Sequence, residues 1–250
     1  MMQWHRIATL SALTLLLAGC WNGQPEQAQG WTPPDRAEIA EQQNPTPKAQ
    51  SLGLCGEAID PALGLKLSIA RQQQREGRLY AALAGLNSLK TQIPTYQLVR
   101  ANLLRKLGQF DEAGTLYEGL ASTCLKGQAL YGMGLVDAWK GQVSQALSQM
   151  NQAIGLLPTD ADLRNDYGFL LLMTGQDAAA RGQLMTALEL DNNHREAARN
   201  LWFLLLKQQD DAGARALAQR FDYNAEDRSA MLQAIHRFRP LRVSMNTQGG

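Results

Sequence analysis

The hydrophobic pattern divides the chain into three parts of different character. An uncharged apolar run of about 14 residues extends from Ile7 to Cys20, behind a short head that contains Arg6. A polar stretch rich in Gln, Pro, Ala and Glu follows, up to Ser51. From Leu63 onward, apolar residues recur with helical spacing. The pattern therefore predicts a leader, a linker and a helical domain.

The first apolar run has the features of a secretory signal peptide. It is shorter than the roughly 20 residues that a membrane-spanning helix needs, and it combines a basic start with small residues at its end. Leu17-Ala18-Gly19-Cys20 resembles the bacterial lipobox. The resemblance implies a signal peptide over residues 1–19 and an acylated Cys20. A plain signal with an incidental cysteine and an uncleaved anchor are the alternatives.

The residue after the lipobox indicates where such a lipoprotein would reside. Trp21 follows Cys20, in place of the Asp that retains lipoproteins at the inner membrane. The resemblance therefore implies the outer membrane, facing the periplasm. Residues 20–51 are predicted to be a disordered tether, because they hold too little apolar surface to offset the entropy of ordering.

Alanine recurs at a nearly constant interval through the helical domain. It stands at positions 82, 113, 146, 180 and 214, in steps of 31, 33, 34 and 34 residues. Each of the first four copies follows a glycine by five residues, as in Gly141 to Ala146 and Gly175 to Ala180. Four evenly spaced copies predict a repeat of two helices joined by a turn.

The repeat resembles the tetratricopeptide motif. Gly134, Ala146 and Pro158 in one copy, and Gly168 and Ala180 in the next, match its small and terminal positions. The resemblance implies an all-α solenoid of about five repeats in a right-handed superhelix. The domain is predicted to span residues 52–235, with a basic flexible tail over residues 236–250. The first and fifth repeats are predicted to be degenerate caps, the fifth with Gln209 at the turn position.

Charge and candidate chemistry argue against several functions. With 24 Lys+Arg against 23 Asp+Glu, the chain lacks the basic excess that a nucleic-acid partner requires. His194 and His236 are isolated in the sequence, and no phosphate loop, nucleophile elbow or Cys-x-x-Cys is present. We therefore predict a non-enzyme without catalytic residues, metal, cofactor or small-molecule substrate. His194 is predicted to be a solvated turn residue.

Paired carboxylates and two further cysteines complete the candidate chemistry. Asp160 with Asp162, and Asp210 with Asp211, are predicted to favour helix N-termini. Cys55 precedes the first helix, and Cys124 ends the second repeat, at the same end of the helical stack. In the oxidising periplasm the two thiols can form a disulfide, whereas two small buried hydrophobic residues are the alternative.

In tetratricopeptide proteins, the first helix of each repeat builds the concave binding face. Carried onto this sequence, that pattern predicts a groove for an amphipathic helix of a protein partner. Some of the aromatic residues could instead pack between neighbouring repeats. The candidate groove residues are Gln128, Tyr131, Leu135, Trp139, Asn165, Phe169, Leu172, Met173, Arg199, Phe203 and Leu206.

Lipobox, tether and repeats together resemble the TadD-like tetratricopeptide lipoproteins of the tight-adherence (Tad/Flp) pilus machinery. The stretch from Leu163 to Phe169 and the stretch from Ala198 to Leu201 are the most suggestive parts. The resemblance implies a pilotin-like scaffold that helps the pilus secretin to assemble in, or reach, the outer membrane. A type IV pilus pilotin and a lipoprotein regulator of a cell-wall synthesis enzyme are the alternatives.

Overall fold

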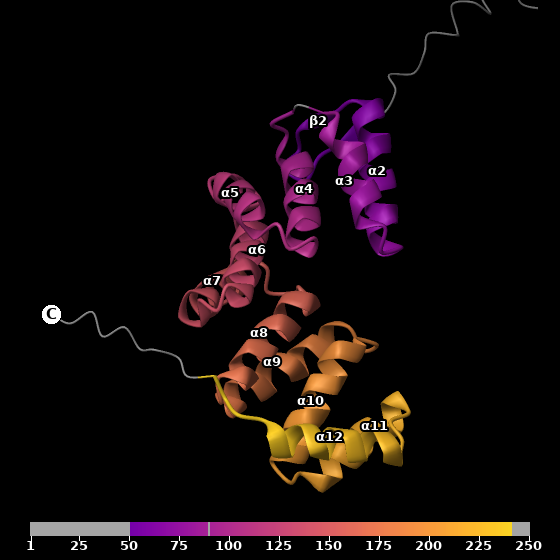
Figure 1. The fold of residues 1–250 in the computed structure, drawn as a ribbon, viewed down its shortest axis with the longest axis vertical. Coiled ribbons are helices and arrows are strands. Elements are labelled where there is room, and N and C mark those ends of the chain that lie inside the picture. The colour runs from indigo at the N-terminus through magenta and orange to yellow at the C-terminus, as the bar shows by residue number, and fades with distance from the viewer. Residues whose placement is uncertain (1–50, 90, 242–250) are drawn as a thin grey trace, which may run out of the picture. The chain divides into compact units, whose positions relative to one another are not determined.

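The structure of the chain is a computed structural model that describes residues 51–89 and 91–241 (Figure 1). Eleven helices follow one another in this part of the chain, after two short strands. The predicted signal peptide, most of the tether with the lipidation residue Cys20, and residues 242–250 lie outside the described residues.

Ten of the helices pair into five successive helix-turn-helix units, and a single helix follows. This arrangement confirms the predicted all-α repeat fold. In order, the helices are α2 (Pro61–Arg75), α3 (Leu79–Asn87), α4 (Pro94–Lys106), α5 (Phe110–Leu120), α6 (Lys126–Trp139), α7 (Val143–Leu156), α8 (Ala161–Met173), α9 (Asp177–Leu190), α10 (Arg195–Lys207), α11 (Asp211–Phe221) and α12 (Ala225–Arg237).

The turn inside each repeat uses a left-handed backbone conformation. In the first four repeats a glycine adopts it, with φ between 74° and 77° at Gly77, Gly108, Gly141 and Gly175. Glycine reaches this region without the steric penalty that a Cβ imposes. In the fifth repeat Gln209 takes the same place, with a φ of 59°. The turn geometry is therefore retained even where the glycine is lost.

Small residues let the two helices of a repeat approach closely. The recurring alanines at positions 82, 113, 146, 180 and 214 are all fully buried. At Gly134 an added Cβ would lie 2.8 Å from the Cγ of Met150, and at Gly168 one would lie 2.9 Å from the Cγ of Leu184. The larger side chains that fill the space between the helices thus leave no room for a side chain at either glycine.

A short hairpin precedes the first repeat. β1 (Ser51–Leu52) pairs antiparallel with β2 (Ala58–Ile59), with Ser51 opposite Ile59. The loop between them is fixed by Glu57, whose Oε1 accepts hydrogen bonds from the backbone N–H of Thr95 at 3.0 Å and from its hydroxyl at 2.6 Å. Ser51, which the sequence assigned to the tether, is thus part of a strand.

A disulfide bond joins the hairpin loop to the end of the second repeat. Cys55 and Cys124 are bonded, with Cα atoms 5.6 Å apart, and they lie 69 positions apart in the sequence. The bridge closes α2, α3, α4 and α5 into a covalent loop.

The C-terminal end of the described chain differs from the predicted flexible tail. His236 and Arg237 form the last turn of α12, where basic side chains favour the helix C-terminus electrostatically. The segment that follows runs back toward α8 (Figure 1), and the backbone N–H of Leu241 donates to the carbonyl of Met173 at 2.7 Å. The ordered chain therefore continues to residue 241, six residues beyond the predicted domain end.

Candidate functional site

The predicted groove residues come from α6, α8 and α10, the first helices of the third to fifth repeats. Their exposure divides them into three groups. Trp139, Phe169 and Arg199 are exposed, whereas Gln128, Tyr131, Leu135, Met173 and Phe203 are half-buried, and Asn165, Leu172 and Leu206 are buried. Trp139 is 72% exposed and Phe169 45%. Two large apolar side chains are thus left in water on neighbouring repeats.

The buried residues of this set pack inside the repeat stack. Leu172 is 2% exposed and belongs to a core cluster with Leu204 of α10. Leu206 is 6% exposed and shares a cluster with Met231 of α12. In both cases the leucine shares a core cluster with a later helix of the stack. Leu206 therefore stabilises the stack, whereas Leu172 also lines the smaller cavity described below.

The two exposed aromatic residues, Trp139 and Phe169, line a cavity of about 460 Å³ between α6 and α8, which we call the α6–α8 cavity. Its apolar wall contains four of the predicted groove residues, Leu135, Trp139, Phe169 and Met173. The structure therefore brings together residues that lie up to 38 positions apart in the sequence.

Two polar residues complete this cavity, and the repeat pattern predicts one of them, Arg105, on the concave face. Arg105 of α4 and Asp166 of α8 both line it. Arg105 has the same place in the second repeat as Ala138 in the third, and this correspondence is the signal that points to it. Asp166 lies outside the groove positions of the repeat pattern, so the sequence holds no comparable signal. The cavity thus combines an apolar wall with one basic and one acidic group.

A smaller cavity of about 140 Å³ continues the same face toward the C-terminal end. Phe169 and Met173 line this cavity as well as the larger one, and Arg199 and Phe203 of α10 join them. Phe238, which follows α12, closes it from the other side. The candidate groove therefore consists of two adjoining cavities that share the α8 side chains.

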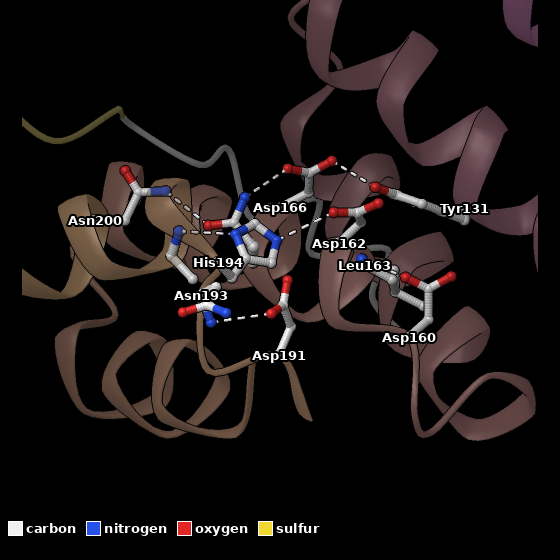
Figure 2. A network of polar contacts seen from close by, with 11 residues as sticks. Tyr131, Asp160, Asp162, Leu163, Asp166, Asp191, Asn193, His194 and Asn200 are labelled. Carbon is white, nitrogen blue, oxygen red and sulfur yellow. Dashed lines mark hydrogen bonds and ion pairs between the residues drawn. The ribbon is translucent and has the colours of Figure 1, made fainter. Parts of the chain in front are cut away.

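A chain of polar contacts ties the three groove helices together (Figure 2). The hydroxyl of Tyr131 on α6 donates to Asp166 Oδ2 at 2.6 Å. The amide of Asn165 donates to Asp166 Oδ1 at 3.0 Å, and the amide of Asn200 on α10 donates to Asn165 Oδ1 at 2.9 Å. Asn165 is 4% exposed. Its amide links repeats and holds them in register, so it does not face a partner.

Burial sets the protonation behaviour of this chain of contacts. Burial raises the pKa of Asp166 above its usual value of 3.8, and the nearby charge of Asp162 acts in the same direction. The hydrogen bonds from Tyr131 and Asn165 and the charge of Arg105 oppose the rise. Burial and the Asp166 charge also raise the pKa of the Tyr131 hydroxyl, so this phenol stays protonated and keeps donating.

His194 differs from the predicted solvated turn residue. It is 7% exposed and is the N-cap of α10, where its Nδ1 accepts a hydrogen bond from the backbone N–H of Ala197 at 3.2 Å. Its Nε2 lies 3.1 Å from Asp162 Oδ1 (Figure 2). Because Nδ1 accepts, Nε2 carries the proton that is shared with Asp162. The ring therefore joins the fourth and fifth repeats at their boundary.

The paired carboxylates perform the predicted capping at two positions. Asp160 accepts from the backbone N–H of Leu163 at 2.9 Å, and Asp210 accepts from that of Gly213 at 2.9 Å. Among the described residues, no group of three or more His, Cys, Asp or Glu side chains could hold a metal ion. The helices of the described part are also too short, or too polar, to cross a bilayer.

Comparison with known proteins identifies the repeat. No protein-family model matches the chain. A curated protein of Pseudomonas aeruginosa, the TPR repeat-containing protein PA4299, is 35% identical over 173 residues, which are 69% of this chain and 70% of the relative. TPR stands for the tetratricopeptide repeat.

Two solved structures show the same fold. The thermophilic TPR protein TTC0263 of Thermus thermophilus superimposes with a TM-score of 0.56 at 21% identity, over 69% of this chain and 98% of its own. The pilF protein of Pseudomonas aeruginosa superimposes with a TM-score of 0.55 at 18% identity, over 69% of this chain and 90% of its own. Repeat period, turn geometry and sequence identity to a curated relative agree: this chain belongs to the tetratricopeptide-repeat protein family.

Proposed function

We propose that the chain is a lipid-anchored scaffold of the outer membrane that binds a protein partner through the face formed by α6, α8 and α10. Proteins of this family act in protein–protein interactions. The observation that carries the proposal is the pair of exposed aromatic side chains, Trp139 and Phe169, on the rim of the α6–α8 cavity. Large aromatic residues beside a pocket are typical anchors for a partner.

The chemistry of the cavity fits a peptide that carries apolar side chains and hydrogen-bonding groups. The walls from Leu135, Trp139 and Phe169 can take up an apolar side chain. Arg105 and Asp166 offer one charge of each sign to orient the main chain or a polar side chain. The sequence pattern predicts an amphipathic helix as this ligand. The course of the segment Phe238–Leu241 along this face favours an extended ligand instead.

As the specific partner we propose the secretin of a Tad/Flp pilus, for which the chain would have a pilotin-like role. Its support is the resemblance of the lipobox, tether and repeats to the lipoproteins of that machinery. The similarity to pilF supports the fold alone. A type IV pilus pilotin would present the same cavity to a different secretin, so the captured partner distinguishes the two roles.

A binding experiment with the secretin tests the site. The double variant Trp139→Ala/Phe169→Ala is expected to lose about 2 kcal/mol of binding free energy, or roughly thirtyfold in affinity, because it removes both aromatic anchors. Tyr80→Ala is a matched control, since Tyr80 is an aromatic residue of α3 that is 75% exposed and does not line either cavity. Unchanged affinity of the double variant would place the interaction elsewhere on the chain.

The anchor is tested separately from the partner. Cells that express the chain are expected to incorporate labelled palmitate into it, because the lipobox cysteine receives acyl chains. The Cys20→Ser variant should lose the label and leave the outer-membrane fraction. Undiminished labelling of that variant would show that Cys20 is not the acylated residue.

A further inference from the structure

The segment Phe238–Leu241 lies on the proposed partner-binding face of α6, α8 and α10. The Phe238 ring meets the Phe203 ring edge to face, with centroids 5.3 Å apart, and Lys207 Nζ lies 5.0 Å from the Phe238 centroid. Three residues later, Leu241 lines the α6–α8 cavity together with Trp139 and Phe169. Phe238 and Leu241 thus form part of the walls of the two cavities of the groove.

The segment is held in an extended form by a backbone contact. The N–H of Leu241 donates to the carbonyl of Met173 at 2.7 Å. Met173 ends α8, and the last carbonyls of a helix have no partner within the helix. Pro240 passes beside Gly175, where an added Cβ would lie 3.5 Å from the proline. The C-terminal end of α8 and the glycine turn after it therefore leave room for an extended peptide to pass.

We propose that Phe238–Leu241 is a built-in competitor that covers the partner-binding face, and that the face recognises an extended peptide of the pattern aromatic-x-Pro-aliphatic. The aromatic side chain packs at the edge of the smaller cavity beside Phe203 and Lys207, where Phe238 lies. The aliphatic side chain packs at the wall of the α6–α8 cavity, where Leu241 lies. The segment then regulates the face by occupying it until a longer partner peptide displaces it.

The segment Phe238–Leu241 is held weakly enough for a partner to displace it. Arg239 and Pro240 are exposed, and Leu241 is 44% exposed. One ring pair, one cation–π contact, one backbone hydrogen bond and one half-exposed leucine hold the segment. Because it is part of the same chain, its effective concentration at the face is in the millimolar range for a short linker. A weak contact is therefore populated in the free protein and yields to a partner that makes more contacts.

The competition lowers the apparent affinity for a partner by the fraction of molecules in which the face is covered. If the segment covers the face in about nine molecules of ten, the apparent Kd is about tenfold weaker than that of the open face. Replacing Phe238 and Leu241 with alanine should release the segment and strengthen the apparent affinity by this factor of about ten. The inference rests on the proposed binding face but does not require the secretin to be the partner.

Fluorescence anisotropy with a labelled peptide tests the proposal on the full chain in detergent. The probe is a synthetic peptide with the sequence His-Arg-Phe-Arg-Pro-Leu, that of residues 236–241. We expect it to bind the Phe238→Ala/Leu241→Ala variant at least about tenfold more tightly than the unaltered chain. Arg239→Ala is the matched control, because the Arg239 guanidinium contacts only carbonyls of its own segment, and it should leave the affinity unchanged.

Two further measurements make the outcome decisive. A peptide with alanine in place of its phenylalanine should bind the double variant more weakly, and circular dichroism should show the same helix content in every protein. Equal binding of the probe to the variant and to the unaltered chain would overturn the proposal, and so would a lack of binding to both. Because the probe comes from this chain, its result is independent of whether the secretin binds.

Discussion

Gly168 in α8 and Gly182 in α9 belong to the same repeat but have different surroundings. A Cβ at Gly168 would lie 2.9 Å from the Cγ of the fully buried Leu184, whereas nothing lies within 4 Å of a Cβ at Gly182. Gly168→Ala is expected to lower the free energy of unfolding by about 1–3 kcal/mol, because the buried leucine and both helices must shift.

The matched substitution Gly182→Ala should have the opposite effect. In an exposed helix interior, alanine raises the free energy of unfolding by about 0.5–1 kcal/mol relative to glycine, since it loses less backbone entropy on folding. Urea denaturation followed by circular dichroism measures both variants. Effects of the same sign would contradict the close-approach role of Gly168.

Asp166 makes the stability of the fold depend on pH. Its folded pKa is raised above the unfolded value of 3.8, mainly by burial. Its contribution to stability is therefore fully present below that value and is lost as the pH rises through the raised folded pKa. Asp166→Asn keeps the size of the side chain and removes this proton linkage. The variant is expected to lose less unfolding free energy between about pH 4 and about pH 7 than the unaltered chain does.

Urea denaturation at several pH values measures this difference. The Asn165 amide can still donate to the new carbonyl, and the Tyr131 hydroxyl can turn to accept from the new amide, so the contacts with both neighbours survive. Parallel pH profiles of the two proteins would contradict a raised pKa of Asp166.

The sequence predicts the inner helix faces but not the exposure of each side chain on them. Leu172 and Leu206 occupy groove positions of the repeat pattern, yet both are buried in core clusters with later elements of the stack. One of these elements, α12, belongs to no repeat and has no signal in the period. His194 was mispredicted because its capping role depends on the turn geometry and on Asp162, 32 residues earlier.

The turn between α10 and α11 has the same backbone conformation as the turns of the other repeats but a different residue type. Gln209 has a φ of 59° where the others have glycine. A residue with a Cβ loses about 1–2 kcal/mol in this region, and glycine avoids that loss but gives up about 0.5–1 kcal/mol of backbone entropy. Gln209→Gly is therefore expected to raise the free energy of unfolding by up to about 1 kcal/mol.

The reverse change in the third repeat is the matched control. Gly141 has a φ of 76°, and a Cβ there would have nothing within 4 Å, so Gly141→Gln tests backbone strain without a steric clash. It should lower the midpoint of thermal unfolding, while Gln209→Gly raises it. An increase in both, or no change in either, would show that the turn conformation does not limit stability.

The helical elements were largely predictable because each repeat must satisfy the same steric conditions. A glycine at the turn, an alanine five residues later and a small residue opposite it are required wherever two helices cross closely, as at Gly134 and Ala146. The same residue types therefore recur at nearly constant intervals in the sequence. The hairpin β1–β2 and the segment Phe238–Leu241 are held by tertiary contacts that do not recur from repeat to repeat, and such contacts leave no period.

Because each repeat contacts mainly its neighbours, the stability of the chain is distributed along its length. The disulfide closes a loop between Cys55 and Cys124, which lie 69 positions apart, and this closure is worth about 4 kcal/mol by chain entropy. Reduction is therefore expected to destabilise α2, α3, α4 and α5 and to leave α8 to α11 almost unchanged.

Hydrogen–deuterium exchange with and without dithiothreitol measures this local effect. Amides of the first two repeats should exchange faster after reduction, and those of α8 to α11 should keep their rates. The double variant Cys55→Ser/Cys124→Ser should reproduce the reduced pattern without a reductant. Uniform acceleration over all repeats would show that the chain unfolds as one cooperative unit.

The bridge also determines how a mechanical pull on the N-terminal side travels through the protein. Tension that enters ahead of Ser51 reaches Cys55 and passes through the covalent bond to Cys124, two residues before α6 begins. The helices α2 to α5 lie in the loop that this bond closes, so the bond carries the force and these helices carry almost none of it. The pull arrives instead at α6, the helix that bears Trp139. If the proposed lipid anchor holds the chain, strain would therefore leave the first two repeats folded, and the helices of the proposed binding face would take the tension.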